Sequence, residues 1–187
     1  YLSIDNLYRS QEILIFREAY ALEKVHGTSA HVAWKDGALT FFSGGESHER
    51  FVGLFDQAAL RERFAALGHA SVIVYGEAYG GACMRMKETY GPELRFIVFD
   101  VLVGESWVSV PAMDQIATGL GLEVVPWRKV PADLEALNAE RDRPSEVAVR
   151  RGCGENRARE GVVLRPLIEL TKNNGERIIA KHKSDTF

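Results

Sequence analysis

Residues 20–34 read Tyr-Ala-Leu-Glu-Lys-Val-His-Gly-Thr-Ser-Ala-His-Val-Ala-Trp, and this stretch decides the fold class. Small and apolar residues lead into Lys24, a Val-His-Gly-Thr segment follows, and apolar residues alternate again from His31 to Trp34. Alternation with a period of two is typical of a half-buried strand, and glycine is typical of a tight loop. The stretch therefore predicts two strands joined by a short loop, with a lysine where the first strand ends.

Turn and cap residues place the other elements. Asp36-Gly37 predicts a hairpin, with the returning strand over 39–42. Asp56 and Gly68 are suited to begin and end a helix. Further helices are expected over 111–120 and 134–141, and further strands over 71–75, 95–103, 162–167 and 177–181. Local hairpins and an excess of strands predict an α+β fold of mainly antiparallel sheets with flanking helices.

Length and composition are those of a single folded domain. The chain of 187 residues can bury a core, so residues 1–187 are expected to form one domain. The net charge is −3, and contact with a polynucleotide would therefore need a local basic patch. Cys83 and Cys153 indicate a reducing cytoplasm rather than a disulfide scaffold. No apolar run is long enough to cross a bilayer, so no membrane contact is expected.

One polar segment, 152–159, is rich in charge and is expected to be a mobile surface loop. A solvated loop is also the ordinary explanation for the basic run formed by Arg150, Arg151, Arg157 and Arg159.

Five short segments contain the residues best suited to chemistry. They are Lys24-Val25-His26-Gly27-Thr28, Tyr75-Gly76-Glu77-Ala78-Tyr79-Gly80, Phe96-Ile97-Val98-Phe99-Asp100, Glu160-Gly161-Val162-Val163-Leu164-Arg165-Pro166 and Ala180-Lys181-His182-Lys183. A lysine beside a glycine turn can attack phosphorus once its amine is deprotonated. Further lysines can neutralise a triphosphate, carboxylates suit ribose hydroxyls and hydrated metal, and an aromatic ring can stack on a purine.

Each of these residues also has an ordinary structural explanation. Lys24 alone would most often be a solvated turn residue, and Phe99 alone would be a core residue of an apolar strand. Lys181 and Lys183 could be one face of a solvated edge strand. The five segments together, in this order, favour the catalytic interpretation.

The segments resemble motifs I, III, IIIa, IV and V of the covalent nucleotidyltransferases, which comprise DNA ligases, RNA ligases and mRNA capping enzymes. The pattern Lys-x-His-Gly-Thr, in place of Lys-x-Asp-Gly, resembles the phage T4 RNA ligase 2 and RNA-editing-ligase branch. The resemblance runs from about Leu22 to Lys183. It implies an ATP-grasp-like nucleotidyltransferase fold and an ATP-dependent RNA ligase. Such an enzyme forms lysyl-AMP, transfers AMP to an RNA 5′-phosphate and seals that end to a 3′-hydroxyl.

The resemblance implies cofactor-binding roles by position. Lys24 matches the nucleophile that becomes adenylylated. Glu23 and Val25 match the positions that read the adenine edge. Glu77 matches the carboxylate of motif III, and Phe99 matches the aromatic residue of motif IIIa that stacks on the base.

Motifs IV and V are implied to handle charge. Glu160 matches a carboxylate near the ribose and near Mg²⁺, or Mn²⁺, which it would contact through water. Lys181 and Lys183 match the cations that hold the phosphates. With Lys24, these three residues are the expected catalytic set, and His26 is expected to orient the loop or the phosphate.

Two departures from the family pattern concern RNA rather than ATP. Ser43-Gly44-Gly45 stands where the family usually has the arginine of motif Ia, and Arg50 is a nearby substitute. Ser29 stands where relatives often have asparagine. No accessory domain is visible after the last motif in this sequence, so the contacts that hold the RNA ends are expected to lie elsewhere. A monomer is favoured.

Three alternatives stay open. A DNA ligase or a capping-type nucleotidyltransferase would share the chemistry, but each favours aspartate at the position of His26, and capping enzymes use GTP. A non-catalytic nucleotide-binding or RNA-end-binding domain would keep the fold alone. The intact set of lysines and carboxylates argues against that last alternative.

Overall fold

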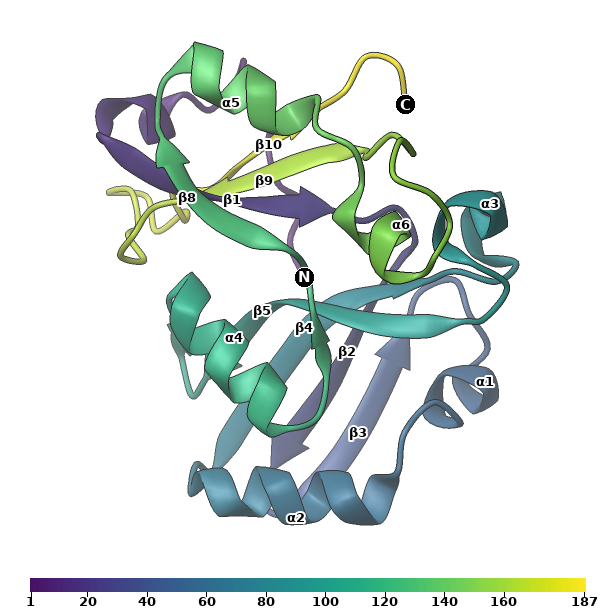
Figure 1. Cartoon of the computed structure of the whole chain (residues 1–187). Coiled ribbons are helices and arrows are strands. Elements are labelled where there is room, and N and C mark those ends of the chain that lie inside the picture. Colours follow the sequence, from purple (N-terminus) through teal and green to yellow (C-terminus); the bar gives the residue numbers. More distant parts are fainter. The chain divides into compact units, whose positions relative to one another are not determined.

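The computed structural model describes residues 1–187 and divides them into two compact units. Unit 1 contains Tyr1–Val25 and Val125–Phe187, and unit 2 contains His26–Val124 (Figure 1). None of the helices is both long enough and apolar enough to span a bilayer. The chain thus leaves unit 1 directly after Lys24 and Val25 and returns to it a hundred residues later.

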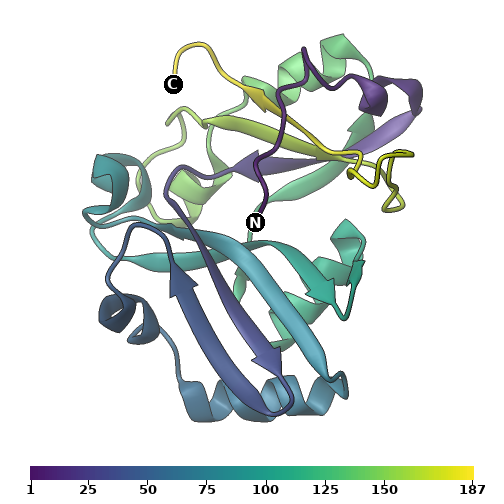
Figure 2. The ribbon, with the colours of Figure 1, turned by 180° about the vertical axis from the view of Figure 1, so that it is seen from behind.

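Unit 1 is built on an antiparallel four-stranded sheet in the order β10-β9-β1-β8. Its strands are β1 (Glu18–Lys24), β8 (Trp127–Pro131), β9 (Gly161–Arg165) and β10 (Ala180–Lys183), and its helices are η1 (Glu12–Ile15), α5 (Leu134–Arg141) and α6 (Glu146–Arg150). The N-terminal segment runs beside β10, where the Leu7 N–H donates to the Lys181 carbonyl at 2.9 Å (Figure 2). Strands β1 and β9 therefore lie inside the sheet.

The core of unit 1 lies on one face of this sheet. Ala21 of β1, Leu164 of β9 and Ala180 of β10 form one row across the strands, and each is at most 3% exposed. They belong to the same buried cluster as Leu137 of α5. Small side chains in this row let the helix approach the sheet closely. Residues one position along each strand point to the opposite face.

Unit 2 is built on a six-stranded sheet in the order β3-β2-β4-β5-β6, with β7 paired in parallel to β5. Its strands are β2 (Thr28–Lys35), β3 (Ala38–Ser43), β4 (Ser71–Tyr79), β5 (Arg95–Val103), β6 (Ser106–Trp107) and β7 (Glu123–Val124), and its helices are α1 (His48–Val52), α2 (Gln57–Leu67), η2 (Cys83–Arg85), α3 (Lys87–Tyr90) and α4 (Val110–Gly119). Asp36 and Gly37 join β2 to β3 with φ of 48° and 82°. Positive φ at both positions is what a tight two-residue hairpin needs.

Helix α2 packs on this sheet by aromatic contact. Asp56 caps the helix by accepting a hydrogen bond from the Ala59 N–H at 3.1 Å, and Gly68 ends it with φ of 75°. The ring of Phe64 stacks on Trp34 of β2, with ring centroids 5.8 Å apart. The predicted boundaries of this helix are confirmed. They could be predicted because Asp56 and Gly68 are residue types that favour the two helix ends.

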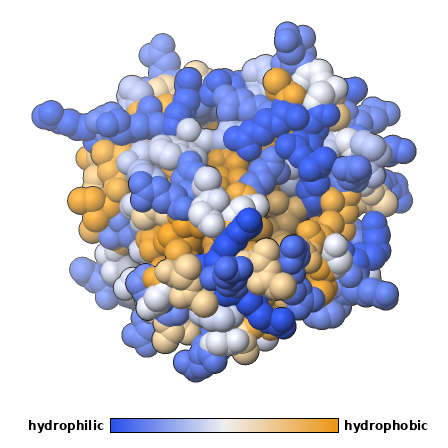
Figure 3. Space-filling view, turned by 60° about the horizontal axis from the view of Figure 1, so that its bottom comes forward, coloured by the Kyte–Doolittle hydropathy of each residue, from blue (hydrophilic) through white to orange (hydrophobic).

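Hydrophobic residues also reach the surface. On the face shown in Figure 3, orange hydrophobic side chains lie among and beneath blue hydrophilic ones, which project furthest outward. The exposed large hydrophobic residues are scattered along the chain, from Tyr1 to Phe187. Scattered apolar residues are normal on a protein surface and carry no functional argument.

The predicted antiparallel α+β fold is confirmed, but some bounds were wrong: β4 runs to Tyr79 and not to 75, β8 and α1 were not predicted, and the last two strands are displaced. Strand β9 ends at Arg165, because Pro166 follows and has no N–H to continue the ladder. The last strand begins at Ala180 and not at 177. Residues 177 and 178 pair instead with 170 and 171, through the Thr171–Arg177 bridge and the Ile178 N–H to the Leu170 carbonyl.

The expectation of a solvated loop was wrong for one of its arginines. Helix α6 ends at Arg150, and Arg157 is exposed, but Arg159 is only 3% exposed. Its guanidinium is satisfied by backbone carbonyls, with Nε and Nη2 donating to the Pro144 carbonyl at 3.3 and 2.9 Å. Backbone acceptors at a distant turn leave no signal in the local sequence.

We predict that Gly76→Ala lowers the free energy of unfolding by about 1–3 kcal/mol, the usual cost of overpacking. A Cβ at Gly76 would lie 2.2 Å from the Ile97 carbonyl oxygen and 2.6 Å from the Phe96 ring. The control is Gly119→Ala, at the end of α4, where a Cβ meets nothing within 4 Å. That change should not destabilise the protein. Urea unfolding measures both, and equal stability of the two variants would contradict the close approach at Gly76.

Candidate active site

Three strands of unit 1 place two lysines on either side of a glycine. Lys24 ends β1 and pairs with Gly161 of β9, and Gly161 pairs in turn with Lys183 of β10. Residues directly opposite one another in adjacent strands share one face of the sheet. A Cβ at Gly161, where φ is 148°, would lie 2.2 Å from the His182 carbonyl oxygen. Only glycine fits this position, because any side chain would collide with the backbone of β10.

The carboxylate of Glu160 contacts both lysines. Its Oε2 lies 2.8 Å from the Lys24 Nζ, and its Oε1 lies 3.2 Å from the Lys183 Nζ. The side chain of Glu160 is 4% exposed, whereas those of Lys24 and Lys183 are 26% and 48% exposed. The Ser184 N–H donates to the Glu160 carbonyl at 2.9 Å and fixes this residue against the end of β10. We call this arrangement, two cations around one buried anion, the Lys24–Glu160–Lys183 cluster.

Lys181 lies on the same face, one row away. The register aligns Leu22 of β1, Val163 of β9 and Lys181 of β10. The outer edge of β10 is covered, because the Lys181 N–H donates to the Asp5 carbonyl at 2.9 Å. The period-two lysines of β10 therefore do not belong to a bare edge strand. They place two cations on the face that also carries Lys24.

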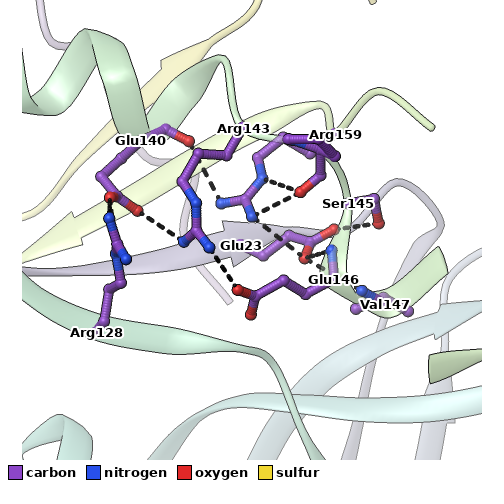
Figure 4. A network of polar contacts seen from close by, with 9 residues as sticks. Glu23, Arg128, Glu140, Arg143, Ser145, Glu146, Val147 and Arg159 are labelled. Carbon is purple, nitrogen blue, oxygen red and sulfur yellow. Dashed lines mark hydrogen bonds and ion pairs between the residues drawn. The ribbon is translucent and has the colours of Figure 1, made fainter. Parts of the chain in front are cut away.

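Glu23 lies on the opposite face of β1, in a buried polar network (Figure 4). Its Oε1 accepts a hydrogen bond from the Ser145 hydroxyl, and its Oε2 accepts from the Glu146 and Val147 N–H groups at 2.9 and 3.3 Å. Burial raises the pKa of the Glu23 carboxyl above its ordinary value, against the lowering effect of the bond from Ser145 and of the Arg159 charge. Both carboxylate oxygens of Glu23 are thus already hydrogen-bonded to the start of α6. Only the backbone of Glu23 could therefore contact adenine.

Val25, the other position expected to read adenine, is 4% exposed at the end of unit 1. The structure brings Lys24, Glu160 and Lys183 together, with Lys181 on the next row. Glu23 points away from them.

Glu77 and Gly27 form the second group of predicted residues, in unit 2. Glu77 of β4 pairs with Ser29 of β2, and its Oε1 accepts a hydrogen bond from the Gly27 N–H at 3.1 Å. A Cβ at Gly27 would lie 2.1 Å from the Ala78 carbonyl oxygen, so this approach also requires glycine. The His26 N–H next to it donates to the Tyr90 hydroxyl at 3.2 Å. The loop that follows Lys24 is therefore tied to β4 and to α3.

Phe99 is half-buried and lies at an irregularity of β5. Tyr75 pairs with Asp100, but the next residue, Gly76, pairs with Val98, so Phe99 is the extra residue of a β-bulge. Bulges redirect side chains and are common beside active sites. Phe99 differs in this respect from its neighbours Ile97 and Val98, which are fully buried in the core.

The segment at the motif Ia position follows β3. The Gly44 N–H donates to the Ser29 carbonyl at 2.9 Å, and a Cβ at Gly45 would lie 2.9 Å from the Thr28 hydroxyl oxygen. Arg50 is 57% exposed, and its Nη1 lies 3.0 Å from Glu46 Oε2. Arg50, the substitute cation considered from the sequence, is thus paired with an acidic residue of the loop before α1.

Arg159 is the polar residue that the sequence interpretation missed. It is ion-paired to Glu23, with 3.8 Å between its Nη2 and Glu23 Oε2, and both side chains are at most 3% exposed. Burial lowers the pKa of the Arg159 guanidinium, against the raising effect of the Glu23 charge. Its one sequence signal was its place directly before Glu160.

No three His, Cys, Asp or Glu side chains are arranged to hold a metal ion directly. Glu160 is instead a single carboxylate within a cationic cluster. Mg²⁺ keeps several waters in many enzymes and binds one or two carboxylates together with substrate phosphates. The donor set therefore fits a hydrated ion shared with phosphates, and it does not fit a dedicated metal cage.

Comparison with known proteins identifies a family and a fold. The family model described as RNA ligase matches residues 17–183. A structure of a Naegleria gruberi RNA ligase variant with ATP and Mn aligns with a TM-score of 0.76 and 16% identity, over 99% of this chain and 56% of that one. The Naegleria gruberi RNA ligase with PPi aligns with a TM-score of 0.75 and 17% identity, over 98% of this chain and 55% of that one. Among the curated proteins, none matches the sequence significantly.

A third structure, a variant of the same ligase with AMP and Mn, gives a TM-score of 0.76 at 16% identity, over 99% of this chain and 56% of that one. The chain spans just over half the length of these structures. At this level of identity the likeness concerns the fold.

We predict that Glu77→Ala lowers the free energy of unfolding by about 1–2 kcal/mol, because the Gly27 N–H loses its acceptor. Glu77→Gln keeps an acceptor oxygen and should stay within about 0.5 kcal/mol of the original protein. Urea unfolding measures both, and ATP binding should weaken in both if the carboxylate itself contacts the nucleotide. Normal ATP binding by Glu77→Gln would leave Glu77 with a structural role alone.

Proposed function

The chain belongs to the RNA ligase family, and we propose that it is an adenylyltransferase domain that activates and seals RNA ends through AMP bound to Lys24. In this proposal ATP is the nucleotide, lysyl-AMP is the intermediate, and an RNA 5′-phosphate and an RNA 3′-hydroxyl are the ends that are joined. The activity, the substrates and the residue roles given below all belong to the proposal.

The observation that carries the proposal is the Lys24–Glu160–Lys183 cluster. Two ammonium groups and one buried carboxylate leave a net positive charge on one face of the sheet, and Lys181 adds to it. The chain as a whole has a net charge of −3, so this positive charge is local. A preorganised group of cations is suited to the charge that develops when a phosphoryl group is transferred.

The first step would bind AMP to the protein. The neutral Lys24 amine attacks the α-phosphorus of ATP, and a nitrogen–phosphorus bond forms. The bond from that phosphorus to the bridging oxygen breaks, and pyrophosphate leaves with the electron pair. The Lys24 ammonium loses two protons in all, one before the attack and one as the nitrogen–phosphorus bond forms. Glu160 Oε2, 2.8 Å from Nζ, is placed to accept one of them, and the other passes to solvent. Lys181 and Lys183 would offset the charge on the phosphates.

The two later steps would use the RNA ends. An oxygen of the 5′-phosphate attacks the phosphorus of lysyl-AMP, and the Lys24 amine is released. A 3′-hydroxyl then attacks the activated 5′-phosphate, a phosphodiester forms, and AMP leaves. Since Lys24 has lost AMP by then, its ammonium can pair again with Glu160 during sealing.

The remaining predicted residues would serve the nucleotide. Glu160 would hold hydrated Mg²⁺, or Mn²⁺, which when bound supplies positive charge at the phosphates. Glu77 would contact the ribose and Phe99 would stack on the purine. Glu23 and Val25 would read the adenine edge through their backbones, because both side chains are buried.

The setting of the reaction is part of the proposal. We place the protein in the cytoplasm as a monomer acting in RNA repair, with residues 1–187 working as one adenylyltransferase domain. The two cysteines are free thiols, which suits a reducing compartment. A DNA ligase, a capping-type enzyme and a non-catalytic binder are the outcomes that the experiments below distinguish.

We predict that the protein becomes covalently labelled by ATP and Mg²⁺, and not by GTP. Lys24→Arg is the matched variant, because arginine keeps a positive charge near Glu160 but cannot act as the nucleophile. Gel analysis with nucleotide labelled at the α-phosphate should show no label on Lys24→Arg. Chasing the labelled protein with a nicked RNA duplex should release AMP as the strands join. Labelling by GTP alone would favour a capping-type enzyme, and no labelling at all would favour a binder.

We also predict that Lys183→Ala and Lys181→Ala each slow labelling about a hundredfold, the usual cost of losing a preorganised contact to a developing charge. The two variants should remain folded, because the Lys183 side chain is half-exposed and Lys181 is held through its backbone. Rates of labelling at saturating ATP measure the effect, with melting temperature as the control. Near-normal rates in both variants would favour the solvated-strand explanation.

A further inference from the structure

A second, buried ion pair lies directly beside the reactive one. Glu23 precedes Lys24 in β1, and Arg159 precedes Glu160 directly before β9. Lys24 pairs with Glu160, and Glu23 pairs with Arg159, so two consecutive residues on each segment form two ion pairs. The Lys24–Glu160 pair is partly open to solvent, whereas the Glu23–Arg159 pair is buried.

The Glu23 carboxylate ties β1 to the first turn of α6, at residues 145–147. It is contacted from three consecutive residues, by the Ser145 hydroxyl and by the N–H groups of Glu146 and Val147 (Figure 4). Ser145 is fully buried and also caps α6 by accepting from the Ala148 N–H at 3.1 Å. The backbone of β1 at Lys24 is therefore held in place by contacts on the sheet face opposite the Lys24 side chain.

Arg159 ties the segment before β9 to residues that precede this turn. Its Nε and Nη2 donate to the Pro144 carbonyl, and its Nη1 donates to the Glu140 carbonyl at 3.4 Å. The Ser145 N–H donates back to the Arg157 carbonyl at 2.7 Å. The segment that carries Glu160 is thus anchored to Glu140, Pro144 and Ser145, and Ser145 is the residue that also contacts Glu23.

A buried ion pair adds little free energy of folding when it joins two segments of a protein. Desolvation of two charges offsets most of their attraction, and apolar residues of similar size often give equal stability. Stability alone therefore does not account for an ion pair at this place. A fixed geometry does, because displacing a reacting group by about 1 Å can cost about a hundredfold in rate.

We propose that Glu23 and Arg159 are positioning residues, whose buried ion pair holds Lys24 and Glu160 in the geometry required for lysyl-AMP formation. This inference rests on the proposed function. Neither side chain is proposed to contact ATP, since Glu23 points to the face of β1 opposite Lys24 and Arg159 donates to the Pro144 carbonyl; Glu23 would contact adenine through its backbone alone. The effect would be on the rate of transfer and not on the affinity for ATP.

The test separates position from stability with single and double variants. Glu23→Gln and Arg159→Met each leave one buried charge unpaired, and each should lower the melting temperature by roughly 6–20 °C. The double variant removes both charges, so its melting temperature should return to within about 6 °C of the original protein. Its labelling rate at saturating ATP should nevertheless stay about tenfold to a hundredfold low. The ATP concentration for half-maximal rate should change less than about threefold, since uniform binding is retained.

Two further variants keep the test decisive. Glu169→Gln removes the carboxylate that Arg165 and Arg177 share elsewhere in unit 1, and it should lower the melting temperature while the labelling rate stays within about twofold. Arg159→Lys keeps the charge but loses the planar set of donors that reaches the Pro144 and Glu140 carbonyls together. Its labelling rate should be about threefold to tenfold lower than that of the original protein, and this holds as a test even where the double variant fails to fold.

A double variant, or a folded Arg159→Lys protein, that labels at the original rate would overturn the positioning role alone. An original protein that takes no label from ATP would overturn the proposed function, and this inference with it.

Discussion

One buried carboxylate, that of Glu160, holds two lysine ammonium groups from two other strands, and the candidate site depends on this contact. It exists because β9 begins with a glycine that lets β10 approach to within a distance no side chain would allow. Lys24 and Lys183 consequently lie on either side of Gly161, and the Glu160 carboxylate contacts both ammonium groups. Without the intervening anion, two cations on one row would repel each other, as like charges opposite one another do in any sheet.

The same contact explains how a mildly acidic chain can present a local cluster of cations, to which the proposed function assigns the triphosphate. The lysines are not spread over the surface but collected on one face of the unit 1 sheet, with the core on the other face. Because side chains alternate between the two faces along β1 and β10, core residues and lysines alternate along these strands. Ala21 and Ala180 pack inward, while Lys24 and Lys181 point outward. The register of the sheet therefore concentrates positive charge locally, as a basic surface patch does in a general nucleic-acid-binding protein.

The sequence predicted the parts that depend on local rules. The hairpin at Asp36-Gly37, the caps of α2 and the lysine at the end of β1 follow from turn and cap chemistry. It could not reveal the role of Arg159, because the partners of that guanidinium are carbonyls of residues 140 and 144 and a carboxylate at 23. It also placed the last strand too early, since the pairing of Arg177 with Thr171 is decided by a return of the chain and not by composition. Strand register, the burial of a charged side chain and the choice among possible pairing partners depend on the tertiary structure, so the local sequence does not predict them.

The central claim is that a phosphoramidate forms at Lys24 and nowhere else. The most direct measurement is peptide mapping by mass spectrometry after incubation with ATP and Mg²⁺, with the peptides kept at neutral or alkaline pH to preserve the bond. The account predicts the added mass of one AMP on the peptide that contains Lys24, located to that residue by fragmentation. AMP found on Lys181 or Lys183 with Lys24 unmodified, or on no peptide at all, would contradict it.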